Sequence, residues 1–356
     1  MTGLRVGIDV TALLGPPTGV HRVTRSLIAA LADDERVDVS GWLLSARGAR
    51  PPIDVTVRRS RVPAALAQRV WARSALLGRI VTGPVDVAHG PNFLAPPTAR
   101  SVISLQDTTP LLHPEWCRPE VAAKAPAIRH AIAAGALVHV SSALVGAEAV
   151  EQLGAAPAQV HLVHHAVEPV AEADPAVAHG LVGADRYLLV LGTVEHRKNV
   201  VAAVRAMADV DEDVHLVISG PAGNAEPELD AALDGLDRRR IHRLPAVDDR
   251  TRNSLLRNAT ALLWPSRYEG FALPPLEALS VGTPIVATAV GALPELVGDQ
   301  VALVPPGDDD AFTGAVTQLV TDDATVPAAV TARIAELTWT RAADAMVAVY
   351  EAAAGR

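Results

Sequence analysis

The sequence predicts an α/β protein made of two Rossmann-like domains, and three observations lead to this prediction. The chain has 356 residues, 49% of them hydrophobic, which suits two domains of ~150 residues better than a single core. Short β-branched runs alternate with longer Ala- and Leu-rich helical patterns, as in parallel sheets that are covered by helices. This alternation occurs twice, on either side of a segment without periodicity.

Each half of the chain contributes one set of strands. The first set is expected at residues 4–10, 85–89, 101–105, 136–141 and 160–165. Helical patterns separate several of these strands, for example at 22–32 and 120–134. The second set is expected at residues 187–191, 214–219, 261–264, 284–287 and 301–304. Because ligands of such folds bind at the carboxyl ends of parallel strands, the loops after the strands are the places to search for a site.

The boundary between the two sets lies in residues 166–185, which are rich in Ala, Pro and Gly and lack clear periodicity. This predicts one domain at 1–170 and a second at 171–338. A last helix is expected within 339–356, with Thr338 as its N-cap. For this helix, a crossing back to the first domain is an option.

Composition excludes several classes of protein. The net charge of −9 argues against a general nucleic-acid-binding protein. The single cysteine, Cys117, excludes an internal disulfide framework and fits a reducing compartment. No zinc-type Cys/His spacing is present, and no run of ~18 uncharged apolar residues predicts a transmembrane helix. The N-terminal stretch MTGLRVGIDVTALLG is interpreted as a strand rather than a secretory signal. We therefore expect a cytoplasmic protein.

Two cations come after the strand expected at 187–191, in the stretch GTVEHRKNV. Gly192 turns the chain, and Arg197 and Lys198 open a helix, where positive side chains are unfavourable unless an anion binds there. Arginine offers a planar fork to phosphate oxygens and lysine a compact charge. Lys198 is one of only two lysines among 31 basic residues. We interpret the stretch as a phosphate site; a solvated helix start is the alternative.

Two glutamates lie in RYEGFALPPLEAL, residues 267–279. Glu269 precedes a glycine, and Glu277 comes after a Pro-Pro pair that suits the start of a helix. We expect Glu277 in the first turn of this helix, where the helix dipole stabilises a carboxylate by ~0.3–1 kcal/mol. A carboxylate there can accept hydrogen bonds from a ribose diol. A merely helix-stabilising glutamate is the alternative, but it does not explain the whole stretch.

The stretch EGFALPPLE resembles the E-x7-E motif of glycosyltransferase family 4, a group of retaining GT-B enzymes that are also called group 1. GTVEHRKN resembles the diphosphate-binding loop of this family, and residues 282–299 resemble the segment that comes after the motif in its members. The N-terminal GPPTGVHRVTRSLIAAL and VAHGPNFLAPP are similar, more loosely, to its acceptor-side half. The resemblance implies a GT-B fold, with an acceptor domain and a nucleotide-sugar domain facing a central cleft.

The resemblance also implies roles for single residues. Arg197 and Lys198 would hold the diphosphate of the donor, and Glu277 would bind its ribose. Glu269 would hold the transferred sugar and, with the two cations, form the catalytic set. The expected donor-binding set is Gly192, Arg197, Lys198, Glu269, Gly270, Phe271, Ala272 and Glu277. Members of the family need no metal or cofactor, because cations and a helix N-terminus can neutralise a leaving diphosphate.

The acceptor side carries one departure from the family pattern. Gln106 stands before Asp107, where the family usually has a histidine, and Gln cannot exchange a proton near neutral pH. His89 is an alternative site residue, with a structural histidine as the competing interpretation. Gly19 and His21 lie where the family has a mobile glycine loop and the start of a helix. All five are expected acceptor or cleft residues.

Residues 58–81 carry six arginines and no acid. An apolar stripe at helical spacing is expected within this segment, consisting of Leu66, Val70, Leu77 and Ile80, with Trp71 at its margin. Such a helix can lie on an anionic bilayer. A core-packed helix with a solvated basic side is the alternative. We therefore keep peripheral contact with the inner face of the membrane as an option.

The sequence thus predicts a metal-independent, retaining glycosyltransferase that moves a hexose from a nucleotide diphosphate sugar. Mannose or a deoxyhexose is favoured, with GDP-mannose as the donor. The acceptor is expected to be a saccharide, a lipid-linked saccharide or a small-molecule hydroxyl. Two alternatives stay open: a non-catalytic nucleotide-sugar-binding subunit, which Gln106 would suit, and a sugar-nucleotide epimerase, which lacks the E-x7-E pattern.

Overall fold

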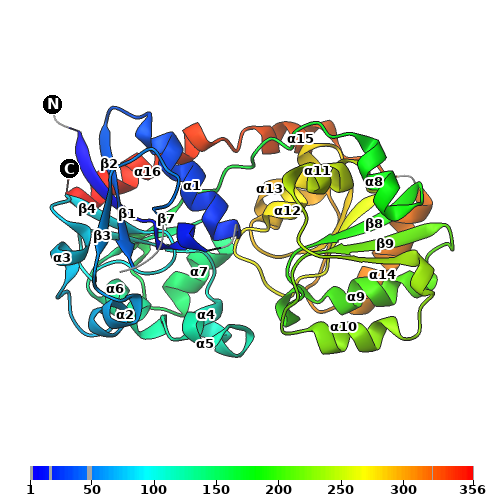
Figure 1. Ribbon diagram of the computed structural model, residues 1–356, viewed down its shortest axis with the longest axis horizontal. Coiled ribbons are helices and arrows are strands. Elements are labelled where there is room, and N and C mark those ends of the chain that lie inside the picture. The colour runs from blue at the N-terminus through cyan, green and yellow to red at the C-terminus, as the bar shows by residue number, and fades with distance from the viewer. Residues whose placement is uncertain (1–2, 16–17, 46–49, 323, 356) are drawn as a thin grey trace. The chain divides into compact units, whose positions relative to one another are not determined.

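The computed structural model describes residues 3–15, 18–45, 50–322 and 324–355. The chain divides into two compact units (Figure 1). The N-terminal unit consists of Met1–Ala166 and Leu337–Arg356, and the C-terminal unit of Val167–Glu336. The C-terminal helix therefore belongs to the N-terminal unit, the option that the sequence left open.

The N-terminal unit contains a parallel sheet of seven strands in the order β3-β2-β1-β4-β5-β6-β7, counted over the described residues. These strands are β1 (Leu4–Asp9), β2 (Val37–Leu44), β3 (Val57–Ser60), β4 (Val87–Gly90), β5 (Ser101–Leu105), β6 (Leu137–Val140) and β7 (Val160–Leu162). Strands β2 and β3 follow β1 towards one edge of the sheet, and β4 to β7 follow one another from the other side of β1 to the opposite edge. A doubly wound sheet offers its ligand site at such a reversal of strand order, beyond the carboxyl ends of the strands.

Helices cover both faces of this sheet (Figure 1). They are α1 (Gly19–Ala32), α2 (Ala64–Trp71), α3 (Gly78–Thr82), α4 (Thr109–Leu112), α5 (Pro119–Ala122), α6 (Ala125–Ala133), α7 (Ala143–Glu151) and α16 (Trp339–Ala354). Short 3-10 segments are η1 (Thr11–Leu14), η2 (Pro114–Trp116) and η3 (Pro157–Gln159). Helix α16 packs against α1 and inserts the fully buried Tyr350 into the core. Thr338 caps α16, because its side chain accepts a hydrogen bond from the backbone N–H of Arg341.

The C-terminal unit contains a parallel sheet of six strands in the order β10-β9-β8-β11-β12-β13, again over the described residues. The strands are β8 (Arg186–Leu191), β9 (Val214–Ser219), β10 (Ile241–Leu244), β11 (Ala261–Trp264), β12 (Ile285–Thr288) and β13 (Leu303–Val304). The order reverses between β8 and β11, which are neighbours in the sheet. The prediction of two Rossmann-like α/β units with parallel sheets is thus confirmed.

The helices of the C-terminal unit alternate with its strands. They are α8 (Pro175–Val182), α9 (Val200–Ala206), α10 (Glu226–Leu233), α11 (Asp249–Asn258), α12 (Leu273–Ser280), α13 (Leu293–Val297), α14 (Asp309–Asp322) and α15 (Ala328–Ala335). The 3-10 segments are η4 (His196–Lys198), η5 (Met207–Asp209), η6 (Arg238–Arg240) and η7 (Gly298–Gln300). No helix of the described residues is long and apolar enough to cross a membrane.

Several expectations about single elements were wrong. Residues 120–134 form two helices instead of one, because Pro126 suits only the first turn of a new helix, α6. Strands β2, β3 and β10 were not expected, and the residues of β10, at the edge of its sheet, are only half-buried. The segment 166–185 was expected to lack periodicity, yet it contains α8. Asp174 caps this helix, and Pro175 occupies its first position.

The segment 58–81 also differs from the single helix that the sequence suggested. Its first residues belong to β3, because Val57 and its successors pair in parallel with β2 from Gly41 onward. The remainder forms α2 and α3, separated by a turn in which Leu77 has a left-handed conformation with φ of 68°. The expected stripe is therefore split over two helices.

Candidate functional site

The candidate site of the C-terminal unit lies beyond the carboxyl ends of β8 and β11, where the strand order reverses. Backbones approach closely here. A Cβ atom on Gly220 would lie 2.0 Å from the carbonyl oxygen of Gly192, so the turn after β9 requires glycine at 220. The loops after β8 and β11 are joined by a backbone hydrogen bond of 2.7 Å, which the N–H of Arg267 donates to the carbonyl of Arg197. The fold itself therefore brings two distant sequence motifs together.

Glu269 lies between the two cations that the sequence singled out. Nη1 of Arg197 donates to Oε2 of Glu269 at 2.9 Å, and Nζ of Lys198 donates to Oε1. The hydroxyl of Ser266 donates to the same Oε1 at 2.9 Å. Glu269 is only 6% exposed, so this cluster of charges is shielded from water. The cation motif and the first glutamate of the E-x7-E motif thus form one buried unit.

Burial and neighbouring charges act in opposite senses on the pKa values of this cluster. Burial alone would raise the pKa of the Glu269 carboxyl, but the charges of Lys198 and Arg197 lower that pKa overall, so Glu269 is ionised. Burial lowers the pKa of Lys198 to about 8, although Glu269 opposes the shift. Arg197 also pairs with Glu195, which is 3.0 Å from its Nε and more exposed. Two cations thus surround the buried carboxylate of Glu269, and Glu195 supplies a second negative charge at the more exposed side of Arg197.

Trp264, at the end of β11, forms the other side of the cluster. Nζ of Lys198 lies 4.0 Å from the centre of the Trp264 ring, which is a close cation–π contact. The ring is almost fully buried, and its Nε1 has no hydrogen-bond partner among the described residues. A small pocket here is lined by residues that include Gly192, Lys198, Trp264 and Ser266. The sequence analysis placed Gly192 and Lys198 at this site but missed Trp264 and Ser266.

The backbone segment 270–272 leads into α12. Ala272 is the N-cap of this helix and has φ of 73°, which is rare for a residue other than glycine. Such conformations cluster at functional sites because the surrounding structure must stabilise them. The carbonyl of Phe271 accepts a hydrogen bond of 3.2 Å from the N–H of Ala292. Gly270, Phe271 and Ala272 therefore lie where the sequence predicted them, between Glu269 and the start of a helix.

Glu277 differs from its prediction. Helix α12 begins at Leu273, so Glu277 lies beyond the first turn, and the expected dipole stabilisation does not apply. Its carboxylate is 1% exposed and accepts a hydrogen bond from Nη2 of Arg252 in α11. The sequence offered no signal for this partner, which lies 25 residues earlier in the chain. The ion pair ties α12 to α11.

The expected acceptor residues lie in the N-terminal unit. Gly19 and His21 are in the first turn of α1, where the side chain of Thr18 accepts a hydrogen bond from the N–H of His21. A Cβ on Gly19 would meet nothing within 4 Å, so the space beside it is open. Nδ1 of His21 is buried and has no hydrogen-bond partner among the described residues. Pro16 and Pro17 of the glycine loop lie outside the described residues.

His89 does not face open space. It is fully buried at the end of β4, and burial lowers its pKa well below the ordinary value. Its Nδ1 lies 2.8 Å from the hydroxyl of Tyr350 and its Nε2 2.8 Å from Oγ of Ser104. Because both ring nitrogens have partners inside the core, this geometry favours the structural interpretation of His89 over contact with an acceptor.

Gln106 and Asp107 come directly after β5, and their side chains have local partners. Nε2 of Gln106 donates to the carbonyl of Pro91 at 2.7 Å, and its Oε1 lies 3.1 Å from Nε2 of His165. Oδ1 of Asp107 accepts hydrogen bonds from the N–H and the hydroxyl of Thr109, at 2.9 and 2.6 Å. Gln106 is thus held as a fixed hydrogen-bonding group between Pro91 and His165.

Asp9 and Lys124 are charged residues of the N-terminal unit that were not predicted as site residues. Asp9 ends β1, next to the reversal of strand order, and burial raises its pKa to about 6. Burial lowers the pKa of Lys124, which the charges of Asp9 and Asp107 oppose. Nζ of Lys124 lies 5.2 Å from the centre of the Phe93 ring. The rarity of lysine in this chain was the only signal that could have found Lys124.

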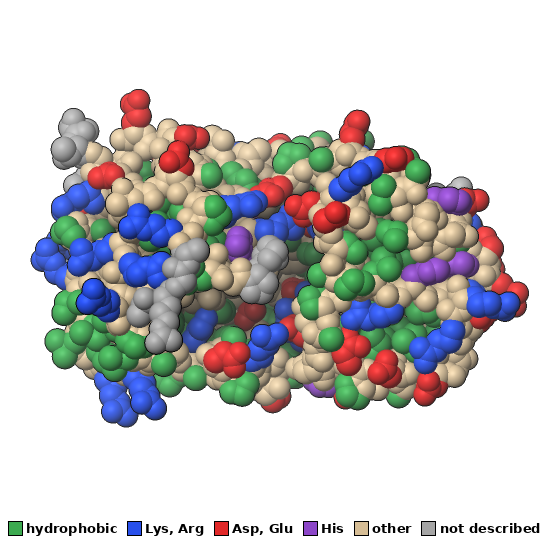
Figure 2. Space-filling view, in the orientation of Figure 1, with side chains coloured by type: hydrophobic (Ala, Val, Ile, Leu, Met, Phe, Trp, Pro, Cys, Tyr) green, Lys and Arg blue, Asp and Glu red, His purple; other side chains and the backbone are tan. Residues whose placement is uncertain are grey.

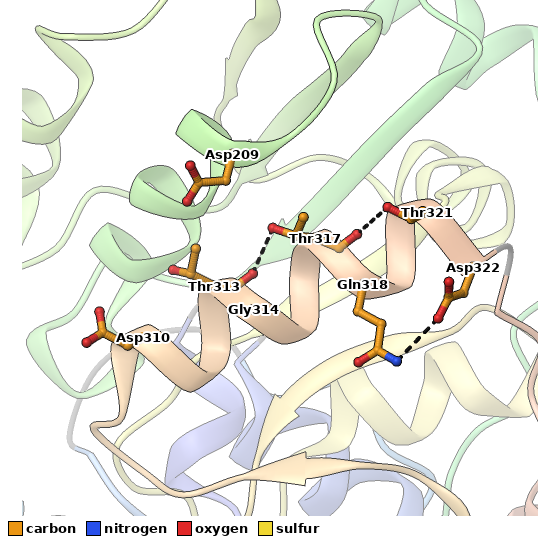
Figure 3. A pocket seen from close by; sticks show the side chains of 8 residues that line it. All are labelled: Asp209, Asp310, Thr313, Gly314, Thr317, Gln318, Thr321 and Asp322. Carbon is orange, nitrogen blue, oxygen red and sulfur yellow. Dashed lines mark hydrogen bonds between the residues drawn. The ribbon is translucent and has the colours of Figure 1, made fainter.

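A shallow groove elsewhere in the C-terminal unit lies along α14 (Figure 3). Its threonine hydroxyls already donate to backbone carbonyls of their own helix: Thr317 to Thr313 at 3.1 Å, and Thr321 to Thr317 at 2.9 Å. None of the lining residues belongs to the predicted site. We therefore assign no role to this groove. Among the described residues, no group of three or more His, Cys, Asp or Glu side chains could hold a metal ion.

Comparison with known proteins links the C-terminal unit to sugar transfer. The family model described as "Glycosyl transferases group 1" matches residues 185–322. The O-antigen chain mannosyltransferase B of Escherichia coli is 35% identical over 142 residues, which cover 38% of this chain and 37% of that protein. The D-inositol 3-phosphate glycosyltransferase of Kribbella flavida is 36% identical over 205 residues, or 50% of this chain and 46% of that protein. The chain thus spans less than half the length of these curated relatives.

Solved structures match over nearly the whole chain. Sucrose-phosphate synthase from Thermosynechococcus elongatus has a TM-score of 0.77 and 18% identity, with 98% of both chains covered. WaaG, a glycosyltransferase of lipopolysaccharide biosynthesis, has a TM-score of 0.68 and 17% identity, also with 98% of both chains covered. Anabaena HepE, solved with UDP and glucose, has a TM-score of 0.66 and 19% identity, with 98% of this chain and 95% of that chain covered. At such low identity the likeness shows the fold alone.

Proposed function

We propose that this chain is a retaining glycosyltransferase that works without a metal ion. The match of residues 185–322 to the model described as "Glycosyl transferases group 1" supports this proposal. The enzyme moves a hexose from a nucleotide diphosphate sugar to the hydroxyl of a saccharide, a lipid-linked saccharide or a small molecule. The observation that carries this proposal is the buried cluster in which Arg197 and Lys198 share the carboxylate of Glu269.

Each member of the cluster has a role in the proposed reaction. Arg197 and Lys198 bind the diphosphate and stabilise the negative charge that develops as the bond between sugar and phosphate breaks. Cations that are already held in place in a water-poor site stabilise this charge without reorganising. Glu269 keeps both cations in position and, with the backbone at 270–272, binds the transferred sugar. No cofactor takes part in this scheme.

The donor is proposed to be GDP-mannose or a related deoxyhexose donor. Two relatives support mannose by their names: the E. coli mannosyltransferase, and the MMP alpha-(1->4)-mannosyltransferase of Mycolicibacterium hassiacum, which is 37% identical over 130 residues. The HepE structures with UDP make a uridine donor the natural competitor. Glu277 is proposed to bind the ribose, with Arg252 orienting its carboxylate.

The proposal extends to location and partners. We propose a cytoplasmic enzyme whose partners are the nucleotide-sugar donor and a saccharide or lipid-linked acceptor. Two other functions would use the same donor site: a non-catalytic nucleotide-sugar-binding subunit and a sugar-nucleotide epimerase. Analysis of products from donor alone separates them, because an epimerase changes the sugar of the donor without any acceptor.

Calorimetric titration with GDP, UDP and dTDP in the presence of EDTA tests the donor site first. We expect one nucleotide to bind selectively to the wild type and more weakly to Glu277→Ala. Binding that appears only when Mg²⁺ is added would contradict metal independence. The nucleotide that binds then selects the donors for transfer assays with an acceptor panel. In these assays, NMR of the product should show the anomeric configuration of the donor sugar retained.

A further inference from the structure

A surface of the N-terminal unit exposes apolar and basic side chains together. It consists of α2, α3 and residues 72–77 between them, and we call it the α2–α3 surface. Leu76 is 71% exposed, Ile80 61% and Leu66 47%, the three highest values for large hydrophobic side chains in the described part of the chain. Single exposed leucines need no explanation, but three from one short segment mark an interaction surface.

The turn between α2 and α3 is held so that Leu76 stays in solvent. Trp71 is fully buried, and its Nε1 donates to the carbonyl of Leu76 at 3.1 Å. The hydroxyl oxygen of Ser74 accepts a hydrogen bond of 3.0 Å from the N–H of Leu76. Leu77 then adopts a left-handed conformation, which is costly for a residue other than glycine. Strain of this kind persists where surrounding contacts impose it, and it often serves a function.

Positive charge surrounds these apolar side chains. The segment 58–81 has no acidic residue, although the whole chain has a net charge of −9. Its exposed arginines are Arg58, Arg61, Arg69, Arg73 and Arg79. Figure 2 shows green side chains with blue ones around them at the end of the molecule where Figure 1 labels α2 and α3. The charge of this surface is thus opposite in sign to that of the chain as a whole.

We propose that the α2–α3 surface docks on an anionic lipid bilayer. Leu66, Leu76 and Ile80 would enter the boundary between headgroups and acyl chains, and the arginines would bind lipid phosphates. A nucleic acid fits less well, because exposed leucines gain nothing from a polyphosphate and the nearby Trp71 is buried. This inference rests on the proposed function in one respect: a glycosyltransferase that docks in this way would meet a lipid-linked acceptor at the bilayer.

Co-sedimentation of the full chain with vesicles tests this proposal. We expect binding to vesicles of phosphatidylcholine mixed with phosphatidylglycerol, weak binding to phosphatidylcholine alone, and a loss of binding as salt is raised. The double variant Leu76→Ser/Ile80→Ser should bind the mixed vesicles about tenfold more weakly. The matched control is Leu162→Ser/Leu181→Ser, which changes leucines that are 46% and 42% exposed elsewhere. This control should bind like the wild type.

A second variant, Arg69→Gln/Arg73→Gln, tests the charge separately and keeps the test valid if the first variant fails to fold. The proposal is overturned if the wild type does not bind the mixed vesicles, or if it binds both kinds of vesicle equally. It is also overturned if both variants bind the mixed vesicles as well as the wild type does. Self-association in gel filtration that these variants abolish would assign the surface to a second copy of the chain, and would overturn it too. Nucleotide titration of the same proteins is a separate readout: intact nucleotide binding without vesicle binding rejects only the membrane surface, and the reverse rejects only the donor site.

Discussion

The ammonium nitrogen of Lys198 lies 4.0 Å from the centre of the Trp264 ring, while the carboxylate of Glu269 binds it from another side. One lysine is thereby fixed between an aromatic ring and a buried carboxylate. Lysine side chains have many rotamers, and holding one in place before a ligand arrives removes part of the entropic cost of binding. The pair of motifs that supplies these contacts comes from two loops far apart in the chain.

Lys198→Ala should weaken binding of the preferred nucleotide diphosphate by ~1.5–3 kcal/mol, the scale of a charge-assisted hydrogen bond. Calorimetric titration measures this change. Lys124→Ala replaces the other lysine, which belongs to the N-terminal unit, and should leave nucleotide affinity unchanged. Equal affinities for wild type and Lys198→Ala would reject the phosphate role of Lys198.

The aromatic ring of Trp264 should contribute to nucleotide affinity beyond the effect of the volume that its side chain fills. Trp264→Phe keeps an aromatic face near Nζ of Lys198, whereas Trp264→Leu removes the cation–π contact, which is worth ~0.5–2 kcal/mol. We therefore expect nucleotide affinity to fall more in the leucine variant than in the phenylalanine variant. Thermal unfolding of both proteins controls for the cavity that each substitution leaves. If the two variants bind the nucleotide equally, the aromatic contact has no role in binding.

Arg252→Met should destabilise the C-terminal unit by about 3 kcal/mol, because it leaves the buried carboxylate of Glu277 without its ion-pair partner. The double variant Arg252→Met/Glu277→Met should recover much of this loss, since no charge stays buried. Urea unfolding of the wild type, both single variants and the double variant measures the coupling. Strictly additive effects would show that the ion pair contributes nothing to stability.

Stability should fall as the pH drops below about 6.5, the ordinary histidine pKa. Burial lowers the pKa of His139 to about 4 and that of His165 to about 3. Between these values and about 6.5, the unfolded chain binds protons that the folded core excludes. Each histidine then lowers the free energy of unfolding by up to about 1.4 kcal/mol per pH unit. Asp9 acts in the opposite sense, because its raised pKa of about 6 lets the folded state take up a proton first.

Urea unfolding at about pH 7.5, about 6.5 and about 5.5 would show this loss. His139→Gln is the informative variant, because Gln can hydrogen-bond to Ser104 and to the carbonyl of Val163, as His139 does, without titrating. Its stability should change less with pH than that of the wild type. Identical pH profiles for the two proteins would mean that His139 does not contribute.

Much of the fold was predictable because its signals are local. Runs such as 187–191 and 214–219 are rich in Leu, Val and Ile, and they become the largely buried strands β8 and β9. The edge strand β10 carries His242 and Arg243 and lacks such a run, so it was missed. Helix α8 was missed because the many Ala, Pro and Gly residues around it resemble a linker, although Asp174 and Pro175 are a regular helix start.

Local sequence specifies which residues end strands and which loops carry Arg197, Lys198 and Glu269. It also specifies that residues 58–81 are basic. These properties depend only on neighbours along the chain. Which charges meet is set by the tertiary structure instead. Glu269 takes both cations because β8 and β11 are adjacent in the sheet, and Glu277 of α12 pairs with Arg252 of α11, 25 residues earlier in the chain. Likewise, whether Trp71 or Leu76 faces solvent depends on packing against the core. Strand order and helix packing bring together residues that are remote in sequence, and no local pattern encodes such contacts.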